Sequence, residues 1–191
     1  VLISGLFESG AAEQLESWLE DNQGWGWDPH RRYCFDSPGG SFLEGVAIAR
    51  LLGYASTGVD ATHRCESACF IAFMAGSFNR QEDRPIIPDR VMHPLARVGF
   101  HQPGLLLERE AYSADEVELA WQIAIEAVAG LIELRIDGER RTHYGLNEAL
   151  LREMLLVPHS NMNYISTVAD ALRFRIMVHP IMIPEIDSVY D

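Results

Sequence analysis

Residues 63–76, His-Arg-Cys-Glu-Ser-Ala-Cys-Phe-Ile-Ala-Phe-Met-Ala-Gly, run from a β-like segment through a polar turn into a continuous apolar segment. This pattern predicts that a strand becomes a helix at Ser67. The first N–H groups of a helix lack partners and favour negative charge, so a serine there suits acyl-transfer chemistry. Serine is also a preferred helix N-cap, and this segment alone favours a cap. The rest of the chain decides between a cap and a nucleophile.

The composition is that of a folded globular protein, with 191 residues of which 48% are hydrophobic and 23% charged. This length fits one domain, or one domain with an appended arm. The net charge of −13 disfavours binding to nucleic acid or to an anionic membrane surface. No apolar run approaches the roughly 20 residues that cross a bilayer. We therefore expect no nucleic-acid partner and no membrane-spanning segment in this chain.

All 15 side chains counted as lysine or arginine are arginine. The absence of lysine excludes a Ser/Lys dyad, a Schiff base and a Walker-type lysine. A base for Ser67 must therefore come from one of the seven histidines or from a carboxylate. The histidines at positions 93, 101, 143 and 159 fall in no known metal-ligand spacing, so we expect no metal site.

Strand-like and helix-like segments alternate from the start of the chain, which predicts an α/β fold. A capping box, Ser113-Ala-Asp-Glu116, begins a long helix that we expect to reach about residue 136. Either Ser166 or Thr167 caps the last helix. The expected strands are 1–7, 31–36, 54–61, 97–101 and 175–179, and the other expected helices are 11–22, 42–52, 146–156 and a last one ending near residue 174.

Three segments lack a clear period. Residues 77–96, rich in Pro, Arg and Asp, are expected to form an irregular surface insertion, and residues 157–164 are expected to be irregular. Residues 181–191 carry two prolines and several large apolar side chains, which suggests an arm that packs on this or a neighbouring subunit. We therefore expect a single domain over residues 1–180 and a C-terminal arm over residues 181–191.

Two further turns could supply groups to Ser67. The turn Ser37-Pro-Gly-Gly-Ser41 follows a strand, and its adjacent glycines can bring backbone N–H groups close to a ligand, as in an oxyanion hole. The alternative is a plain tight turn. His101 ends a short apolar strand beside turn residues, a position typical of an active-site group. The alternative there is a histidine that is merely exposed or hydrogen-bonded.

Three motifs in register resemble the proteolytic subunit of Clp protease. They are Phe35-Asp-Ser-Pro-Gly-Gly-Ser41, Cys65-Glu-Ser-Ala-Cys69 and Gly99-Phe-His-Gln-Pro103. The likeness is closest to the ClpP-like predicted periplasmic proteins and covers nearly the whole chain in order. It implies a ClpP/crotonase-like fold of repeated β-β-α units and a cofactor-free serine peptidase acting on extended or unfolded polypeptides. It also implies a homo-oligomer and a periplasmic or otherwise extracytoplasmic location.

The resemblance assigns roles to individual residues. It implies Ser67 as the nucleophile and His101 as the general base. The oxyanion hole would come from the backbone N–H groups of the Gly39-Gly40 turn, Gly39 first, and of Ala68, the residue after the serine. A histidine that takes the hydroxyl proton and preorganised N–H donors that stabilise an oxyanion agree with the reading from the residues themselves.

The third member of the triad departs from the family. Its position falls among Asn161, Met162 and Asn163, none of which is an acid. Three interpretations are open: an asparagine orients His101, an acid comes from elsewhere, or the site is a Ser/His dyad. The missing acid motivates a rival function, a catalytically degenerate binding or scaffold module. A crotonase-like acyl-CoA enzyme is a third, because paired oxyanion donors would suffice for it.

Three cysteines, Cys34, Cys65 and Cys69, are an odd number, which is not the pattern of a disulfide scaffold. Cys65 and Cys69 flank Ser67 at two residues on either side. They could form a disulfide with each other or with Cys34, they could bind zinc with His63, or they could be small buried side chains. We favour buried side chains, because free cysteine is among the most buried residue types.

Overall fold

The computed structural model describes residues 1–22, 31–78, 87–104, 111–134, 146 and 148–180. The strands in these residues are β1 (Leu2–Ser4), β2 (Arg32–Asp36), β3 (Ser56–Val59), β4 (Arg64–Glu66), β5 (Ser77–Phe78), β6 (Ile87–Pro88), β7 (Arg90–Met92), β8 (Arg97–Phe100), β9 (Asn163–Tyr164) and β10 (Met177–Val178). The helices are α1 (Ala11–Asp21), α2 (Phe42–Leu51), α3 (Ala68–Met74), α4 (Ala114–Glu133), α5 (Glu148–Leu156) and α6 (Val168–Arg173).

Two sheets form the centre of the molecule. The larger sheet has the order β1-β2-β3-β7-β10, and all of its neighbouring strands are parallel. In the smaller sheet β4 and β8 are parallel, and β9 is antiparallel to β8. Parallel neighbours need crossover connections, which the intervening helices supply. The α/β class expected from the alternating segments is therefore confirmed.

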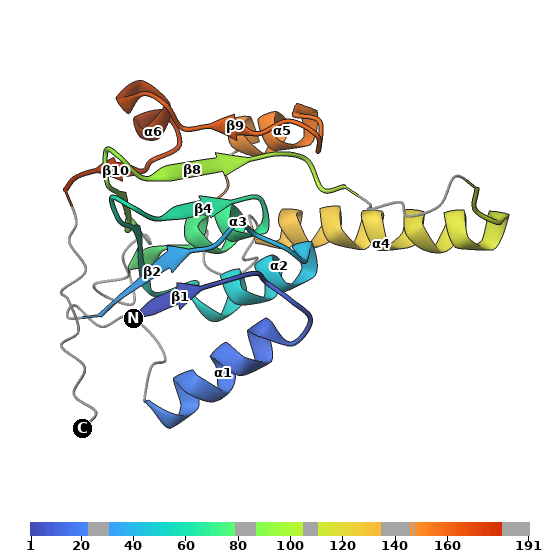
Figure 1. Cartoon of the computed structure of the whole chain (residues 1–191), viewed down its shortest axis with the longest axis horizontal. Coiled ribbons are helices and arrows are strands. Elements are labelled where there is room, and N and C mark those ends of the chain that lie inside the picture. Colours follow the sequence, from blue (N-terminus) through green and yellow to red (C-terminus); the bar gives the residue numbers. More distant parts are fainter. Residues whose placement is uncertain (23–30, 79–86, 105–110, 135–145, 147, 181–191) are drawn as a thin grey trace.

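Helices cover both ends of this arrangement, as Figure 1 shows, with α1 and α2 below the larger sheet and α5 and α6 beyond β8. Helix α3 lies inside, and all seven of its residues are buried. An apolar sequence on every side of a helix is typical of such a central position. The buried core therefore surrounds the helix that follows Ser67.

Helix α4 differs from the others because its N-terminal part projects away from the body (Figure 1). The capping box at Ser113 is confirmed: its side chain accepts from the Glu116 N–H, and the Glu116 carboxylate accepts from the Ser113 N–H. Only Ala127, Gly130 and Leu131, near the C-terminal end, are buried. Large apolar side chains along the projecting part, such as Val117 and Trp121, are exposed.

The expectation of an irregular surface insertion at residues 77–96 is wrong for β7. This strand lies inside the larger sheet between β3 and β10, and its three residues are buried. The guanidinium of Arg90 donates to the carbonyl of Arg175 at 3.0 Å and also to that of Met74. Arg90, between Pro88 and Pro94, interrupts the apolar pattern of this segment. The sequence therefore did not indicate a central strand there. Residues 79–86 of the expected insertion lie outside the described residues.

Smaller differences concern the ends of elements. The first strand stops at Ser4 rather than at residue 7, because Gly5 turns the chain with a φ of 93°. Thr167, one of two candidates, caps α6 by accepting from the Asp170 N–H. Residues 163–164, expected to be irregular, pair with β8. The expected arm at residues 181–191 lies outside the described residues. Among the helices that the structure describes, none combines the length and the apolar character needed to span a membrane.

Candidate active site

Ser67 is the single residue between the end of β4 and the start of α3. Its backbone has φ 56° and ψ −121°, and its N–H donates to the Gly99 carbonyl at 3.0 Å. Within the described residues its side chain makes no capping hydrogen bond to α3. The interpretation of Ser67 as an ordinary helix cap is therefore wrong, because its hydroxyl does not bond to the helix.

The conformation of Ser67 is costly for an L-residue. Positive φ angles are uncommon outside glycine, and they persist at sites where the surrounding structure enforces them. Apart from glycines, the only other described residue with positive φ is Arg175. A strained serine at a strand-to-helix turn is the arrangement that exposes a nucleophilic hydroxyl beside unpartnered helix N–H groups.

The glycine turn packs directly on this elbow. Gly39 has a φ of 94°, and a Cβ atom built on it would lie 2.5 Å from the carbonyl oxygen of Glu66. The N–H of Glu66 donates to the Ser37 carbonyl at 3.1 Å, which joins the turn to β4. The N–H of Gly39 itself donates to the Ser37 Oγ atom at 3.0 Å. The Gly39 N–H, expected as the first oxyanion donor, therefore already donates to the Ser37 side chain, a local bond typical of serine in turns.

His101 follows directly after β8. Its Nδ1 atom lies 2.6 Å from the carbonyl oxygen of Gln102. A carbonyl oxygen can only accept, so this hydrogen bond requires a proton on Nδ1 of the neutral ring. The Nε2 atom then carries a lone pair, which is the tautomer that a general base needs.

The strand that carries His101 is fixed against the helix that follows Ser67. The ring of Phe100 lies 5.0 Å from that of Phe70 in α3 and 6.0 Å from that of Phe174, measured between centroids. On the other side, the Gln102 N–H donates to the Val157 carbonyl at 2.8 Å. Aromatic packing and this backbone bond therefore set the position of His101 relative to Ser67.

A pocket of about 280 Å³ brings most of the predicted site residues together. Its wall includes Ser67, His101, Gly40 and Ala68, and Gly39 is not among its lining residues. Phe42, Ile71 and Pro103 add an apolar side. No hydrogen bond joins the Ser67 hydroxyl and the His101 ring in this part of the chain, and such bonds often tighten only when substrate binds. The remaining lining residues are Ser41, Gln102 and Gly104.

The two asparagines at the expected third position make no hydrogen bond to the imidazole in the described part of the chain. Asn163 lies in β9 opposite Phe100, and Asn161 is exposed, with its N–H donating to the Pro158 carbonyl at 2.9 Å. Among the hydrogen bonds of the described residues, none joins either side chain to His101. The partner of the ring is instead a backbone carbonyl, which carries no sequence signal.

Glu66, the residue before the serine, is a buried carboxylate that the sequence did not single out. Its Oε1 atom lies 2.9 Å from an Arg97 guanidinium nitrogen and accepts from the Tyr164 hydroxyl at 3.1 Å. The Tyr164 hydroxyl also accepts from the Arg97 guanidinium at 2.7 Å, and this bond, followed by the charge of Glu66, raises the pKa of the exposed Arg97 guanidinium. Glu66 therefore ties β4 to β8 and β9 and does not take the place of a triad acid.

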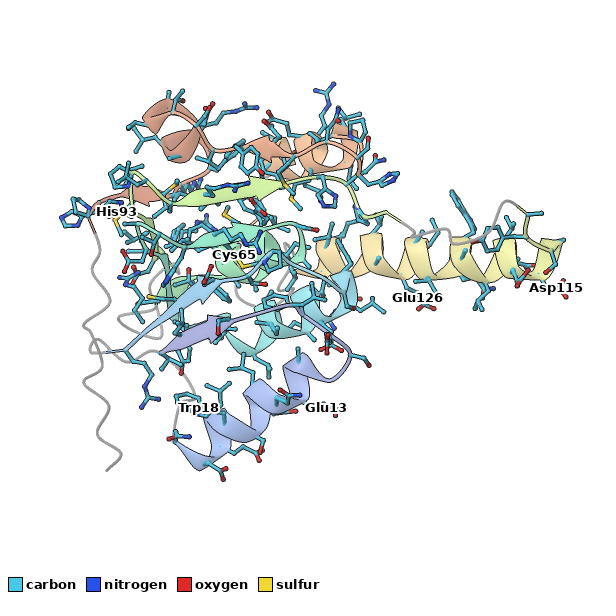
Figure 2. The ribbon with its side chains drawn as sticks, viewed as in Figure 1. Glu13, Trp18, Cys65, His93, Asp115 and Glu126 are labelled. Atoms are coloured by element: carbon cyan, nitrogen blue, oxygen red, sulfur yellow. A yellow bond between two sulfur atoms is a disulfide. The ribbon has the colours of Figure 1, made fainter. Side chains whose placement is uncertain are left out.

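The cysteines on either side of Ser67 are joined by a disulfide, seen in the body of the molecule at Cys65 in Figure 2. Both are fully buried, and their Cα atoms are 5.1 Å apart. The preference for unpaired buried side chains at Cys65 and Cys69 is therefore wrong. Cys34 is a free buried thiol, and burial raises its pKa.

Metal chemistry and known relatives give no further indication for this site. In the described part of the chain, no group of three or more His, Cys, Asp or Glu side chains is placed to hold a metal ion. Cys65 and His63 therefore do not form part of such a group. No protein-family model matches the chain, and no curated protein matches it significantly.

Proposed function

We propose that the chain is a serine peptidase of the ClpP/crotonase type that hydrolyses peptide bonds in extended or unfolded polypeptides. The observation that carries the proposal is Ser67, held at positive φ with its hydroxyl uncommitted, in one pocket with His101. An accessible hydroxyl, a histidine with a free Nε2 and helix N-terminal N–H groups are the parts that acyl transfer requires. The proposal needs no cofactor.

In this mechanism the Ser67 Oγ atom attacks the scissile carbonyl while Nε2 of His101 takes the hydroxyl proton. The negative charge on the carbonyl oxygen is stabilised by the N–H groups of Ala68 and Gly40, which replaces Gly39 as donor because Gly39 already serves Ser37. His101 then protonates the leaving amine as the C–N bond breaks. Water, activated by the same histidine, hydrolyses the acyl-serine and restores the site.

The partner of His101 sets the expected strength of this site. The carbonyl of Gln102 holds the ring in the correct tautomer, as a triad acid would. A neutral carbonyl stabilises the imidazolium less than a carboxylate does, because it offers a partial rather than a full negative charge. We therefore propose a slow peptidase with a Ser/His dyad.

Incubation with a permanently unfolded polypeptide, such as reduced and alkylated casein, tests this function. Mass spectrometry of the products would show new termini with the wild-type chain and none with Ser67→Ala or His101→Ala. Both variants must keep the circular dichroism of the wild type, so that loss of cleavage is not loss of fold. Equal cleavage by Ser67→Ala would assign the activity to a contaminant or to another residue.

A second candidate function is a binding or scaffold module that has lost catalysis. It is favoured by one observation: in the described residues, no carboxylate or asparagine side chain hydrogen-bonds to His101. Binding of the unfolded polypeptide by a folded chain that neither cleaves it nor reacts with a serine-directed probe would support this function. Tight binding of an acyl-CoA instead would point to the crotonase-like alternative.

Self-association and an extracytoplasmic location are part of the same proposal. Helix α4 projects from the body and exposes large apolar side chains, among them Trp121 at 67% and Val117 at 58%. Exposed apolar surfaces of this kind favour contact with a partner, here a second copy of the chain. The Cys65–Cys69 disulfide supports an oxidising compartment such as the periplasm.

A further inference from the structure

The disulfide spans the elbow on which the proposed function rests. Cys65 lies in β4 and Cys69 in the first turn of α3, so the closed ring runs from two residues before Ser67 to two residues after it. Ser67 is the middle member of this ring and the one residue in it with positive φ. The bond therefore fixes the two arms of the turn at a set separation.

Backbone hydrogen bonds to other segments hold the strand side of the elbow, whereas the first turn of α3 is held by packing, for example of Ala68 against Gly45 in α2. The N–H of Glu66 donates to Ser37, and that of Ser67 donates to Gly99. On the helix side, the Phe70 N–H donates back to the Ser67 carbonyl at 3.0 Å, which is a bond within the turn itself. The disulfide is a second covalent link between β4 and α3, in addition to the main chain through Ser67. Without it, rotation of the first turn of α3 could relax φ at Ser67 and move both the hydroxyl and the Ala68 N–H.

The size of the ring argues against a role mainly in global stability. A disulfide stabilises chiefly by restricting the unfolded chain, and this effect is smaller for a short loop than for a long one. The residues joined here are separated by only four positions. The bond therefore does little to restrict the unfolded chain but constrains the geometry of the turn that it closes.

We propose that the Cys65–Cys69 disulfide is a positioning element for the nucleophile, so that only the oxidised chain assembles a competent site. Both sulfurs are buried, which shields them from thiols in solution. The redox state is then set while the chain folds rather than changed afterwards. In formation, two thiols give up two electrons and two protons to a disulfide oxidant such as oxidised glutathione, which leaves as two glutathione thiols.

The test compares rates of labelling by a fluorophosphonate, which loses fluoride as a P–O bond forms to the serine. Wild-type protein refolded with oxidised glutathione, wild-type protein refolded with a phosphine reductant, and Cys65→Ala/Cys69→Ala are compared at equal concentration. Cys34→Ala is the matched control, because it removes the buried cysteine outside the ring. Circular dichroism and a thermal unfolding curve accompany each sample.

We expect the oxidised wild type and Cys34→Ala to react at the same rate. The reduced wild type and the double variant should fold but react about 100-fold more slowly, the loss typical of a small misplacement of a reacting group. Unfolding the reduced wild type and refolding it with oxidised glutathione should restore the rate, which a merely structural role would not require. Equal rates in folded oxidised and reduced protein would overturn the positioning role.

Three further outcomes are decisive. If neither reduced wild type nor double variant folds, the bond is a requirement of the fold and the positioning role is wrong. Thiol counting by mass spectrometry in denaturant, without reductant, should find one alkylated cysteine in the oxidised protein, and three would refute the bond. Failure of the folded, oxidised wild type to react at all would refute the serine hydrolase itself, and the inference that rests on it.

Discussion

A Cβ atom on Gly39 would lie 2.8 Å from the Cβ atom of Ser67. No side chain can occupy that space, so the glycine turn and the nucleophile elbow are in direct backbone contact. This contact explains why the turn at residues 37–41 and the segment at residues 63–76 belong to one site although they are distant in the sequence. It also makes Gly39 a test of the geometry that does not alter either reacting side chain.

Gly39→Ala should destabilise the fold and abolish labelling of Ser67 by a fluorophosphonate. Gly5→Ala is the matched control, because Gly5 has nearly the same φ, 93°, but open space around it. The control should lose about 1 kcal/mol of unfolding free energy from the positive φ alone. Gly39→Ala should lose about 1–3 kcal/mol more, through overpacking against Glu66 and Ser67. Urea unfolding measures both, and equal losses would mean that the close contact is absent.

Ser67→Gly should stabilise the protein while removing its proposed activity. Glycine adopts positive φ without the strain of about 1–3 kcal/mol that a side chain incurs there. The greater freedom of glycine in the unfolded chain offsets about 0.4–1 kcal/mol of this gain. We expect the free energy of unfolding of Ser67→Gly, measured in urea, to be about 1 kcal/mol higher than that of Ser67→Ala. A less stable glycine variant would show that Ser67 is not strained.

The asparagines at positions 161 and 163 should be dispensable for labelling of Ser67. Asn161→Ala and Asn163→Ala remove side chains that make no hydrogen bond to His101 within the described residues, so each should keep the labelling rate within about twofold. His101→Ala is the reference for loss of the base, which typically lowers rates by about 10²–10⁴-fold. If either alanine variant falls to the level of His101→Ala, an asparagine rather than the Gln102 carbonyl orients the ring.

The thiol of Cys34 should make the fold less stable in alkaline solution. Burial raises its pKa above the ordinary value of 9.0, so the folded state keeps the proton that the unfolded state releases. Below pH 9 both states are protonated and the thiol has no effect on the pH dependence. Above pH 9, the free energy of unfolding should fall by about 1.4 kcal/mol per pH unit until the pH reaches the pKa of Cys34 in the folded state.

Urea unfolding of the wild type and of Cys34→Ala from pH 7 to pH 10, without reductant, measures this effect. The wild type should lose stability relative to the variant above pH 9, where its unfolded state gains an ionised thiol. A difference between the two proteins that does not change with pH would show that Cys34 ionises as easily in the folded state.

The parts of the fold that follow from local rules could be predicted from the sequence. The apolar segments predicted the strands β2, β3 and β8, and a capping box located the start of α4 at Ser113. The start of α6 was narrowed to Ser166 or Thr167, of which Thr167 is the cap. Strand β7 could not be predicted, because its buried Arg90 finds its hydrogen-bond partners in Met74 and Arg175, which are distant in the sequence. A charge satisfied by tertiary contacts has no local signature.

In the candidate site, too, some residues could be predicted from local sequence, and the groups that depend on tertiary contacts could not. Ser67, Gly40, Ala68 and His101 could be selected by motif and spacing, and they line one pocket. The groups that orient them are backbone atoms or depend on pairing: the Gln102 carbonyl, the Ser37 hydroxyl and the Cys65–Cys69 bond. Ser37, placed two residues before Gly39, had a recognisable signal, because serine commonly bonds to backbone N–H groups in turns. The other two do not, since a carbonyl is common to every residue and three cysteines allow several pairings.

The central claim, that Ser67 is an activated nucleophile, is tested most directly by locating a covalent adduct. Folded, oxidised protein is treated with a fluorophosphonate, digested and sequenced by mass spectrometry. The account predicts one adduct on Ser67, absent in Ser67→Ala and formed at least about 100-fold more slowly in His101→Ala. An adduct on another residue, or no adduct on the folded wild type, would contradict it.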